Sequence, residues 1–195
     1  MKSFHNISKI KKIVLFASGN GSNVENIVRF FLNDSLVDVV AVITNNPNAG
    51  VIDRCVKLDV KCVVLPKNTC LDGKLLHAEL LNFKPDLIVL AGYLLKIPEE
   101  IAQTFKIINI HPALLPKYGG KGMYGHHVHE AVMANKEGKT GISIHYVNDK
   151  YDDGQIIFQA SCQIDPSDNA QSIAQKVHHL EMMYFPKIIA KILHG

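Results

Sequence analysis

Asn109 and His111 have side chains of the types that acyl transfer requires, and the acidic segment 149–154 could add a carboxylate. Asn109 and His111 stand two positions apart at the end of a predicted strand, so alternation along the strand puts both on one side. An amide can donate to the oxygen of a tetrahedral intermediate, and an imidazole can exchange protons near neutral pH. A carboxylate beside the imidazole, which Asp149, Asp152 or Asp153 of that segment could supply, would raise the pKa of the imidazole and orient it. Together they predict an acyl-transfer site, although each motif alone is also compatible with a structural role.

A second group is the sequence Ser-Gly-Asn-Gly-Ser-Asn at 18–23, between the first predicted strand and its helix. Glycines let the backbone approach a ligand, and free N–H groups at a helix N-terminus favour a phosphate or carboxylate. The segment has neither the G-K-[ST] of a Walker A loop nor the third glycine of a dinucleotide fingerprint, so a nicotinamide cofactor is not expected. It predicts an anion site; a plain turn with a helix cap at Ser22 or Asn23 is the alternative.

The histidines do not predict a metal site. On a helix, His127 and His129 would point in different directions, and no cysteine or H-E-x-x-H motif accompanies them or His126. We therefore expect this cluster to support a lid or a helix start, and we expect no metal. His178 and His179 are neighbours in the last predicted helix, so one of them could reach a ligand near the glycine-rich segment.

Short apolar runs that alternate with helical patterns must position these groups. Strands are predicted at 13–17, 37–43, 61–65, 87–91 and 107–110, and helices at 24–31, 51–58, 71–81 and 97–105. Strands without polar alternation are buried on both faces, which is typical of a parallel sheet. The fold class predicted is α/β, a doubly wound, mostly parallel sheet with helices on both faces. Ligands of such sheets bind at the carboxyl ends of the strands.

The alternation of strands and helices changes after the fifth predicted strand. A turn-rich stretch at 111–125 precedes a predicted helix at 126–134, and two further strands at 141–147 and 155–164 form an expected antiparallel pair. A last amphipathic helix follows Asp168, and Pro186 is expected to kink or interrupt it. Without a repeat or linker, we predict one domain over residues 1–195.

Composition excludes several classes of protein. The chain has 195 residues, of which 47% are hydrophobic and 20% charged, unlike disordered or fibrous proteins. A formal net charge of +3 predicts an anionic small molecule rather than nucleic acid as partner. Four cysteines without C-x-x-C spacing predict reduced thiols and a cytoplasmic location. The longest apolar run, at 87–95, is too short to cross a bilayer, so no membrane partner is expected.

Three motifs in this order resemble one family. They are the segment 18–23, the run I-N-I-H-P-A-L-L-P-K-Y at 108–118, and Asp-Asp-Gly at 152–154. The chain resembles the folate-dependent phosphoribosylglycinamide formyltransferases over nearly its whole length, which have a Rossmann-like formyltransferase fold. The resemblance implies transfer of a formyl group from 10-formyltetrahydrofolate, a cosubstrate, to the amine of phosphoribosylglycinamide in purine synthesis, in a monomer or homodimer.

The resemblance also implies residue roles. Asn109 would hold the formyl oxygen, His111 would donate a proton or stabilise charge, and Asp152 would raise the pKa of that histidine. The ribonucleotide and its phosphate would be bound by Gly19, Asn20, Gly21, Ser22, Asn23, His178 and Glu181. The folate would lie against Leu94, Leu95, Lys96, Ile97, Asn109, Asn148, Asp149, Tyr151 and Asp152.

The chain departs from the family pattern in several places, one of which is Asp153, where a glycine is frequent. A glycine-rich insertion at 119–125 is expected to form a lid, and Leu95 stands where an arginine is frequent in the folate wall. The family's arginine for the acidic tail of the folate has no clear match, and this contact is left open between Lys67 and Lys74. Lys117 is a possible neighbour of the phosphate. Three alternatives remain open: a hydrolase that deformylates the same folate, a methionyl-tRNA formyltransferase, and a noncatalytic sensor of nucleotide phosphates.

Overall fold

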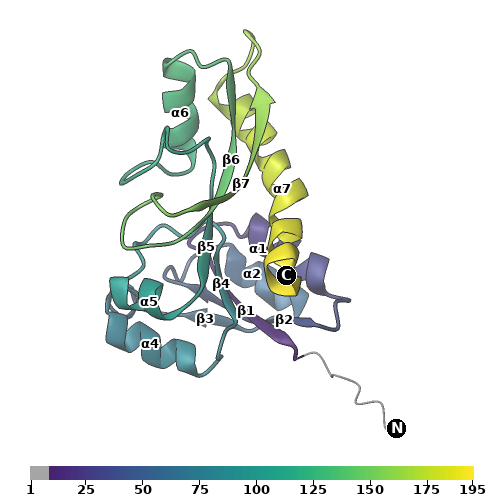
Figure 1. The fold of residues 1–195 in the computed structure, drawn as a ribbon, viewed down its shortest axis with the longest axis vertical. Helices are drawn as coiled ribbons and strands as arrows, with labels where there is room; N and C mark the ends of the chain where they lie inside the picture. Colours follow the sequence, from purple (N-terminus) through teal and green to yellow (C-terminus); the bar gives the residue numbers. More distant parts are fainter. Residues whose placement is uncertain (1–8) are drawn as a thin grey trace.

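Seven strands form one sheet in the computed structural model, which describes residues 9–195. The order across the sheet is β3-β2-β1-β4-β5-β6-β7 (Figure 1). The first five strands pair in parallel, whereas β5–β6 and β6–β7 pair antiparallel. The strands are β1 (Lys11–Phe16), β2 (Val37–Thr44), β3 (Cys62–Val64), β4 (Leu87–Leu90), β5 (Ile107–His111), β6 (Lys139–Tyr146) and β7 (Ile156–Gln163). The predicted fold class, with its C-terminal antiparallel pair, is confirmed.

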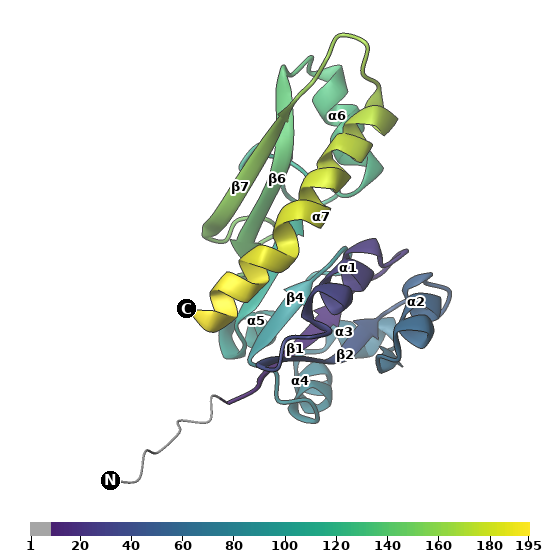
Figure 2. The same ribbon diagram turned by 90° about the vertical axis from the view of Figure 1, so that its right-hand side faces the viewer.

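Helices cover both faces of this sheet (Figures 1 and 2). They are α1 (Ser22–Phe31), α2 (Val51–Leu58), α3 (Lys67–Leu71), α4 (Gly73–Leu81), α5 (Glu99–Thr104), α6 (His126–Ala134) and α7 (Ala170–His194). Alternation along β1 sends Ile13 and Leu15 into a core with α1, α2 and α7, and Val14 and Phe16 into a second core with α3, α4 and α5. Because both faces are buried, the strands carry apolar residues without polar alternation.

The order of strands along the chain reverses between β1 and β4. From β1 the chain adds β2 and β3 on one side and then returns to add β4 and β5 on the other. The loops that follow β1 and β4 therefore diverge to opposite faces and leave a crevice at their carboxyl ends. Residues 18–23 and 91–97 lie in these two loops.

Gly21 sets the start of α1. Its φ of 77° is in the left-handed region that favours glycine, and a Cβ there would meet the Val51 side chain at 2.5 Å. No side chain caps the helix, so the alternative of a cap at Ser22 or Asn23 is wrong. The first N–H groups of α1 consequently have no capping side chain as a partner.

The predicted helix 71–81 begins two residues later, as α4, because Leu71 is the last residue of the separate short helix α3. Asp72 between them has extended backbone, and its carboxylate accepts hydrogen bonds from the N–H groups of Lys74 and Leu75. Aspartate favours such a capping position over a helix interior, which explains the break. Similarly, α5 begins at Glu99, after Pro98, rather than at Ile97.

Helix α7 continues through Pro186, so the proline does not interrupt it, whereas the kink expected as the other possibility stays a prediction. A proline has no N–H for the carbonyl four residues earlier, which is that of Met182. The side chain of Asn26 on α1 donates to that carbonyl at 2.9 Å. A partner from α1 thus replaces the missing helix hydrogen bond and joins α1 to the long helix that runs beside it (Figure 2). None of the helices within residues 9–195 has the length and apolar character needed to span a membrane.

We predict that Asn26→Ala lowers the free energy of unfolding by about 1–2 kcal/mol, because it leaves the Met182 carbonyl without a partner. In a Pro186→Ala background the same substitution should cost less, since the introduced alanine would supply the helix N–H that proline lacks. Urea denaturation of the four proteins measures this coupling. Equal costs in both backgrounds would contradict the assignment.

Candidate active site

A cavity of about 740 Å³ opens at the carboxyl ends of β1, β4 and β5. It is lined from the loops after β1 and β4, from the segment before α6, from the loop between β6 and β7, and from α7. It brings together nearly all of the predicted site residues, namely Gly19, Asn20, Gly21, Ser22, Asn23, Leu94, Leu95, Lys96, Ile97, Asn109, His111, Asn148, Tyr151, Asp152, His178 and Glu181. Asp149 is the exception: it is exposed and does not line the cavity.

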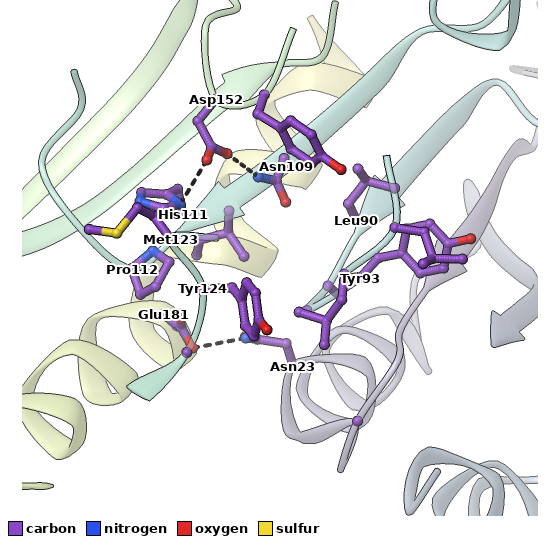
Figure 3. A pocket seen from close by; sticks show the side chains of 18 of the residues that line it. Asn23, Leu90, Tyr93, Asn109, His111, Pro112, Met123, Tyr124, Asp152 and Glu181 are labelled. Carbon is purple, nitrogen blue, oxygen red and sulfur yellow. Dashed lines mark hydrogen bonds and ion pairs between the residues drawn. The ribbon is translucent and has the colours of Figure 1, made fainter. Parts of the chain in front are cut away.

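Asp152 joins the two predicted residues of β5 (Figure 3). One carboxylate oxygen lies 3.5 Å from His111 Nδ1, and the other accepts from Asn109 Nδ2 at 3.3 Å. The backbone N–H of Gly120 donates to Asp152 Oδ2 at 3.0 Å. The neighbouring Asp153 is exposed and pairs with Lys150, so Asp152 is the acid that meets the imidazole.

The backbone of Asp152 has φ 52°, in the left-handed region. Aspartate adopts this conformation more readily than most residues, but it still costs free energy and is frequent at functional sites. The turn aims the carboxylate inward, where the side chain is only 11% exposed. The strained backbone of Asp152 thus places its carboxylate between β5 and the segment before α6.

His111 is almost completely buried, and its protonation depends on two opposing effects. Burial lowers its pKa below the usual value, and it outweighs the Asp152 charge and the Tyr118 carbonyl, which both act to raise it. Nε2 donates to the Tyr118 carbonyl at 2.7 Å, which leaves Nδ1 as the nitrogen toward Asp152. The expected upward contribution from Asp152 is therefore present, but the pKa of His111 is lowered overall.

Asp152 itself is held in the charged form. Burial acts to raise its pKa, but His145, His111 and the N–H of Gly120 together outweigh burial and lower it. The cluster therefore combines a carboxylate that stays ionised with an imidazole that is neutral near pH 7. In such a pair the imidazole can take up a proton and release it again beside a fixed negative charge.

His145 was not predicted from the sequence, yet it completes this cluster. It stands opposite Asn109 in the β5–β6 register and is 2% exposed. Its Nδ1 donates to the Tyr146 carbonyl at 2.8 Å, so its Nε2 accepts from Asn109 Nδ2 at 3.1 Å. A histidine inside the apolar run 141–147 is the signal that could have identified it.

The glycine-rich segment meets α7 through Glu181. Asn23 Nδ2 donates to Glu181 Oε2 at 2.9 Å, and His178 Nδ1 lies 3.2 Å from the same oxygen (Figure 3 shows the contact to Asn23). Glu181 raises the pKa of His178, which favours its protonated form. A carboxylate, an amide and an imidazole with a raised pKa thus border the anion site predicted at 18–23.

Ser18 connects the two loops that form the crevice. Its hydroxyl donates to Asn45 Oδ1 at 2.7 Å and accepts from the N–H of Leu94 at 3.0 Å. The segment 18–23 and the wall at Leu94 are therefore held at a fixed spacing. Ser18 is mostly buried and was not predicted to have this role.

The glycine-rich insertion closes one side of the cavity. Gly120, Lys121, Gly122, Met123 and Tyr124 line it, and Gly120 ties the segment to Asp152. Lys117, proposed from sequence as a phosphate neighbour, instead pairs with Glu137 at 2.8 Å and does not line the cavity. Within the part of the chain that the structure describes, no group of three or more His, Cys, Asp or Glu side chains could hold a metal ion.

Comparisons with known proteins agree with this geometry. The family model described as formyl transferase matches residues 11–189. The chain is 34% identical over 191 residues to the phosphoribosylglycinamide formyltransferase of Bacillus subtilis (strain 168), covering 95% of that protein. It is 36% identical to a chloroplastic phosphoribosylglycinamide formyltransferase of Arabidopsis thaliana. Among solved structures, the phosphoribosylglycinamide formyltransferase of Coxiella burnetii superposes with a TM-score of 0.86 at 31% identity, with 96% of this chain and 89% of that chain covered.

Relatives differ in length and compartment. This chain matches 93% of its own length to the Arabidopsis protein but spans only 65% of that protein, and 60% of a second plant relative, from Vigna unguiculata. Both plant proteins are named as chloroplastic. The cytoplasmic location expected for this chain, and its state as a monomer or homodimer, therefore stay predictions.

We predict that Asp152→Asn lowers the pKa of His111 further, because burial is then opposed only by the Tyr118 carbonyl and the Glu181 charge and no longer by the Asp152 charge. A histidine whose folded pKa lies below its unfolded value adds stability above the unfolded pKa, about 6.5, and loses it as the pH falls. Asp152→Asn should move this loss to a lower pH. An NMR titration of the His111 ring checks the direction, with Asp153→Asn as the matched control. A pKa that rises or stays constant would refute the coupling.

Proposed function

The chain belongs to the formyl transferase family, and we propose that it transfers a formyl group from 10-formyltetrahydrofolate to the amine of phosphoribosylglycinamide in purine synthesis. One observation carries the proposal. The Asn109–His111–Asp152 cluster opens into the same cavity as the anion site at Gly21–Asn23. A reactive centre and a phosphate-binding site within one cavity suit an acceptor that carries both an amine and a phosphate.

The acceptor phosphate would lie at the start of α1. Gly21 permits close approach of a ligand, and no side chain occupies the first N–H groups of the helix. His178, which Glu181 favours in its cationic form, lines the same cavity and would add positive charge. Salt screening would weaken this contribution because His178 is half exposed.

The folate would lie on the opposite side, along residues 94–97 after β4. Leu94 is 48% exposed although it is a large apolar side chain, and it lines the cavity beside Leu95. An exposed leucine in a cavity suits the flat face of a pterin ring. Asn148 and Tyr151 from the β6–β7 loop supply polar groups on the other wall.

The reaction we propose has a tetrahedral intermediate. The acceptor amine bonds the formyl carbon, the carbonyl electron pair moves to the oxygen, and the bond from carbon to the folate nitrogen then breaks. The amine loses a proton and the leaving nitrogen gains one, with His111 as the group that moves the proton and Asp152 as the charge that stabilises the imidazolium. Asn109 stabilises the negative oxygen, and one such donor contributes roughly 10²–10³ in rate.

The hydrogen bonds of Asn109 define how it could serve the oxygen. Its amide has two N–H groups, and both have partners, His145 Nε2 at 3.1 Å and Asp152 Oδ1 at 3.3 Å. The contact to Asp152 is the longer and therefore the weaker. We propose that the formyl oxygen takes this hydrogen, while His145 holds the other and fixes the amide plane.

We predict that purified protein releases tetrahydrofolate only when the ribonucleotide acceptor is present. His111→Ala should reduce kcat by at least about 10²-fold, since proton transfer by a positioned side chain contributes roughly 10²–10⁴. An assay that follows both folate products, with and without acceptor, measures this. His179→Ala is the matched control, because His179 is exposed and does not line the cavity.

The same assay separates the alternatives. Formate release without an acceptor would favour the deformylating hydrolase, formylation of methionyl-tRNA would favour the tRNA enzyme, and binding of the ribonucleotide without turnover would favour a sensor. A His111→Ala variant with near-normal turnover would contradict the proposed reaction.

Gly21 offers a second test, directed at the phosphate. We predict that Gly21→Ala raises the KM for the ribonucleotide by more than about tenfold, because its φ of 77° and the Val51 side chain at 2.5 Å both oppose a Cβ. Gly138→Ala is the matched control, since a Cβ there meets no atom within 4 Å and Gly138 does not line the cavity. Initial rates at varied ribonucleotide give both values, and equal values for the two variants would place the phosphate elsewhere.

A further inference from the structure

Buried polar atoms without a partner gather around the cavity. Among residues 9–195, four buried side-chain atoms have no hydrogen-bond partner: Asn23 Oδ1, Tyr93 Oη, His129 Nδ1 and Thr140 Oγ1. The residues of the first three line the cavity, whereas Thr140 does not. Proteins rarely leave buried polar groups unpaired, and an unpaired group in a binding cavity is a group that a ligand can satisfy.

His129 is one of these residues to which the proposed reaction gives no function. It lies in α6, is 6% exposed and lines the cavity together with Glu181 and Asn23. No hydrogen bond to its Nδ1 is found in the described part of the chain. Its neighbours His126 and His127 on the same helix are instead exposed and pair with Glu130.

The imidazole of His129 is in its neutral form near pH 7. Burial lowers its pKa, which outweighs the upward effect of the Glu181 charge, while His126 and His111 lower it further. A neutral imidazole has one N–H donor and one acceptor nitrogen, which suits a hydroxyl group better than a phosphate. The ring therefore offers a polar contact beside a carboxylate rather than a second positive charge.

The proposed acceptor has hydroxyl groups at the corresponding place. Its pentose ring lies between the phosphate and the glycinamide amine, and it carries two neighbouring hydroxyls. With the phosphate at Gly21–Asn23 and the amine at Asn109 and His111, the pentose would lie in the intervening part of the cavity. Glu181, held by Asn23 at 2.9 Å, lines the cavity from α7, and His129 lines it from α6, near enough for the Glu181 charge to act on the pKa of His129.

We propose that His129 is a further substrate-binding residue, which hydrogen-bonds a hydroxyl of the acceptor pentose beside Glu181 and selects a ribonucleotide over its deoxy analogues. The inference rests on the proposed function. A hydroxyl that donates to the Glu181 carboxylate can at the same time accept from an imidazole N–H, so the two residues would act on one group. A site that pairs a substrate hydroxyl rejects an analogue without it, because its own polar groups are then left unpaired.

The test compares three acceptors in wild type and His129→Ala: phosphoribosylglycinamide and its 2-deoxy and 3-deoxy analogues. The variant should raise the KM for the ribonucleotide about tenfold, equivalent to about 1.4 kcal/mol, with kcat and the KM for the folate within about twofold of wild type. In wild type, at least one deoxy analogue should carry a similar KM penalty. That penalty should disappear in His129→Ala, because removing the imidazole already removes the hydrogen bond that the missing hydroxyl would have made.

Three controls separate binding from folding. Thr140→Val removes an unpartnered buried polar atom outside the cavity and should leave every KM unchanged. His127→Ala changes an exposed histidine of the same helix and should also be silent. His129→Gln retains a donor and an acceptor and should recover part of the selectivity; it serves as the test variant if His129→Ala fails to fold by circular dichroism.

The outcomes are distinct. If wild type transfers no formyl group to any acceptor, the proposed function fails. If wild type is active but each deoxy analogue carries the same KM penalty in wild type and His129→Ala, the assignment of His129 to the pentose is overturned. A loss confined to kcat would also overturn it, because the residue would then act on the reacting atoms and not on the pentose.

Discussion

The site depends on one buried carboxylate. Asp152 is charged although its side chain is only 11% exposed, and such a charge is tolerated only when donors surround it. Asn109 Nδ2 from β5 and the Gly120 N–H from the segment before α6 donate to it, and the rings of His111 and His145 lie 3.5 Å and 3.6 Å from its oxygens. The need to satisfy Asp152 therefore fixes the relative positions of segments that are distant in the sequence.

The sheet supplies the rigid frame for this carboxylate. Its parallel half ends in the crevice between the loops after β1 and β4, whereas its antiparallel half places β6 beside β5. Only the antiparallel neighbour sets His145 opposite Asn109, and the loop between β6 and β7 then returns Asp152 to the same point. The mixed topology is thus a requirement of the site: a parallel neighbour of β5 would need a long crossover instead of a short loop.

Sequence reasoning succeeded where one local pattern determines the result. Apolar runs located the strands, and alternation placed Asn109 and His111 on one side of β5. Sequence reasoning failed where a residue distant in the chain determines the local structure or the role of a side chain. His145 was missed because its meaning depends on the register of β5 and β6, and the unbroken helix at Pro186 was not predicted because Asn26, on a helix near the other end of the chain, satisfies the carbonyl that the proline leaves free. At Asp72 the local signal was present, since the aspartate caps α4, but the apolar periodicity concealed it.

The cavity is also where strained backbone and unpaired buried polar atoms gather. Asp152 has a left-handed backbone, and Asn23, Tyr93 and His129 each hold a buried polar atom without a partner. Such features each cost free energy, so a site under no functional demand would lose them by substitution. The two cores on either side of the sheet offset that cost, because strands buried on both faces contribute apolar area twice. A ligand that pairs these atoms would therefore bind and stabilise the fold through the same contacts, which links substrate recognition to the stability of the loops around β1, β4 and α6.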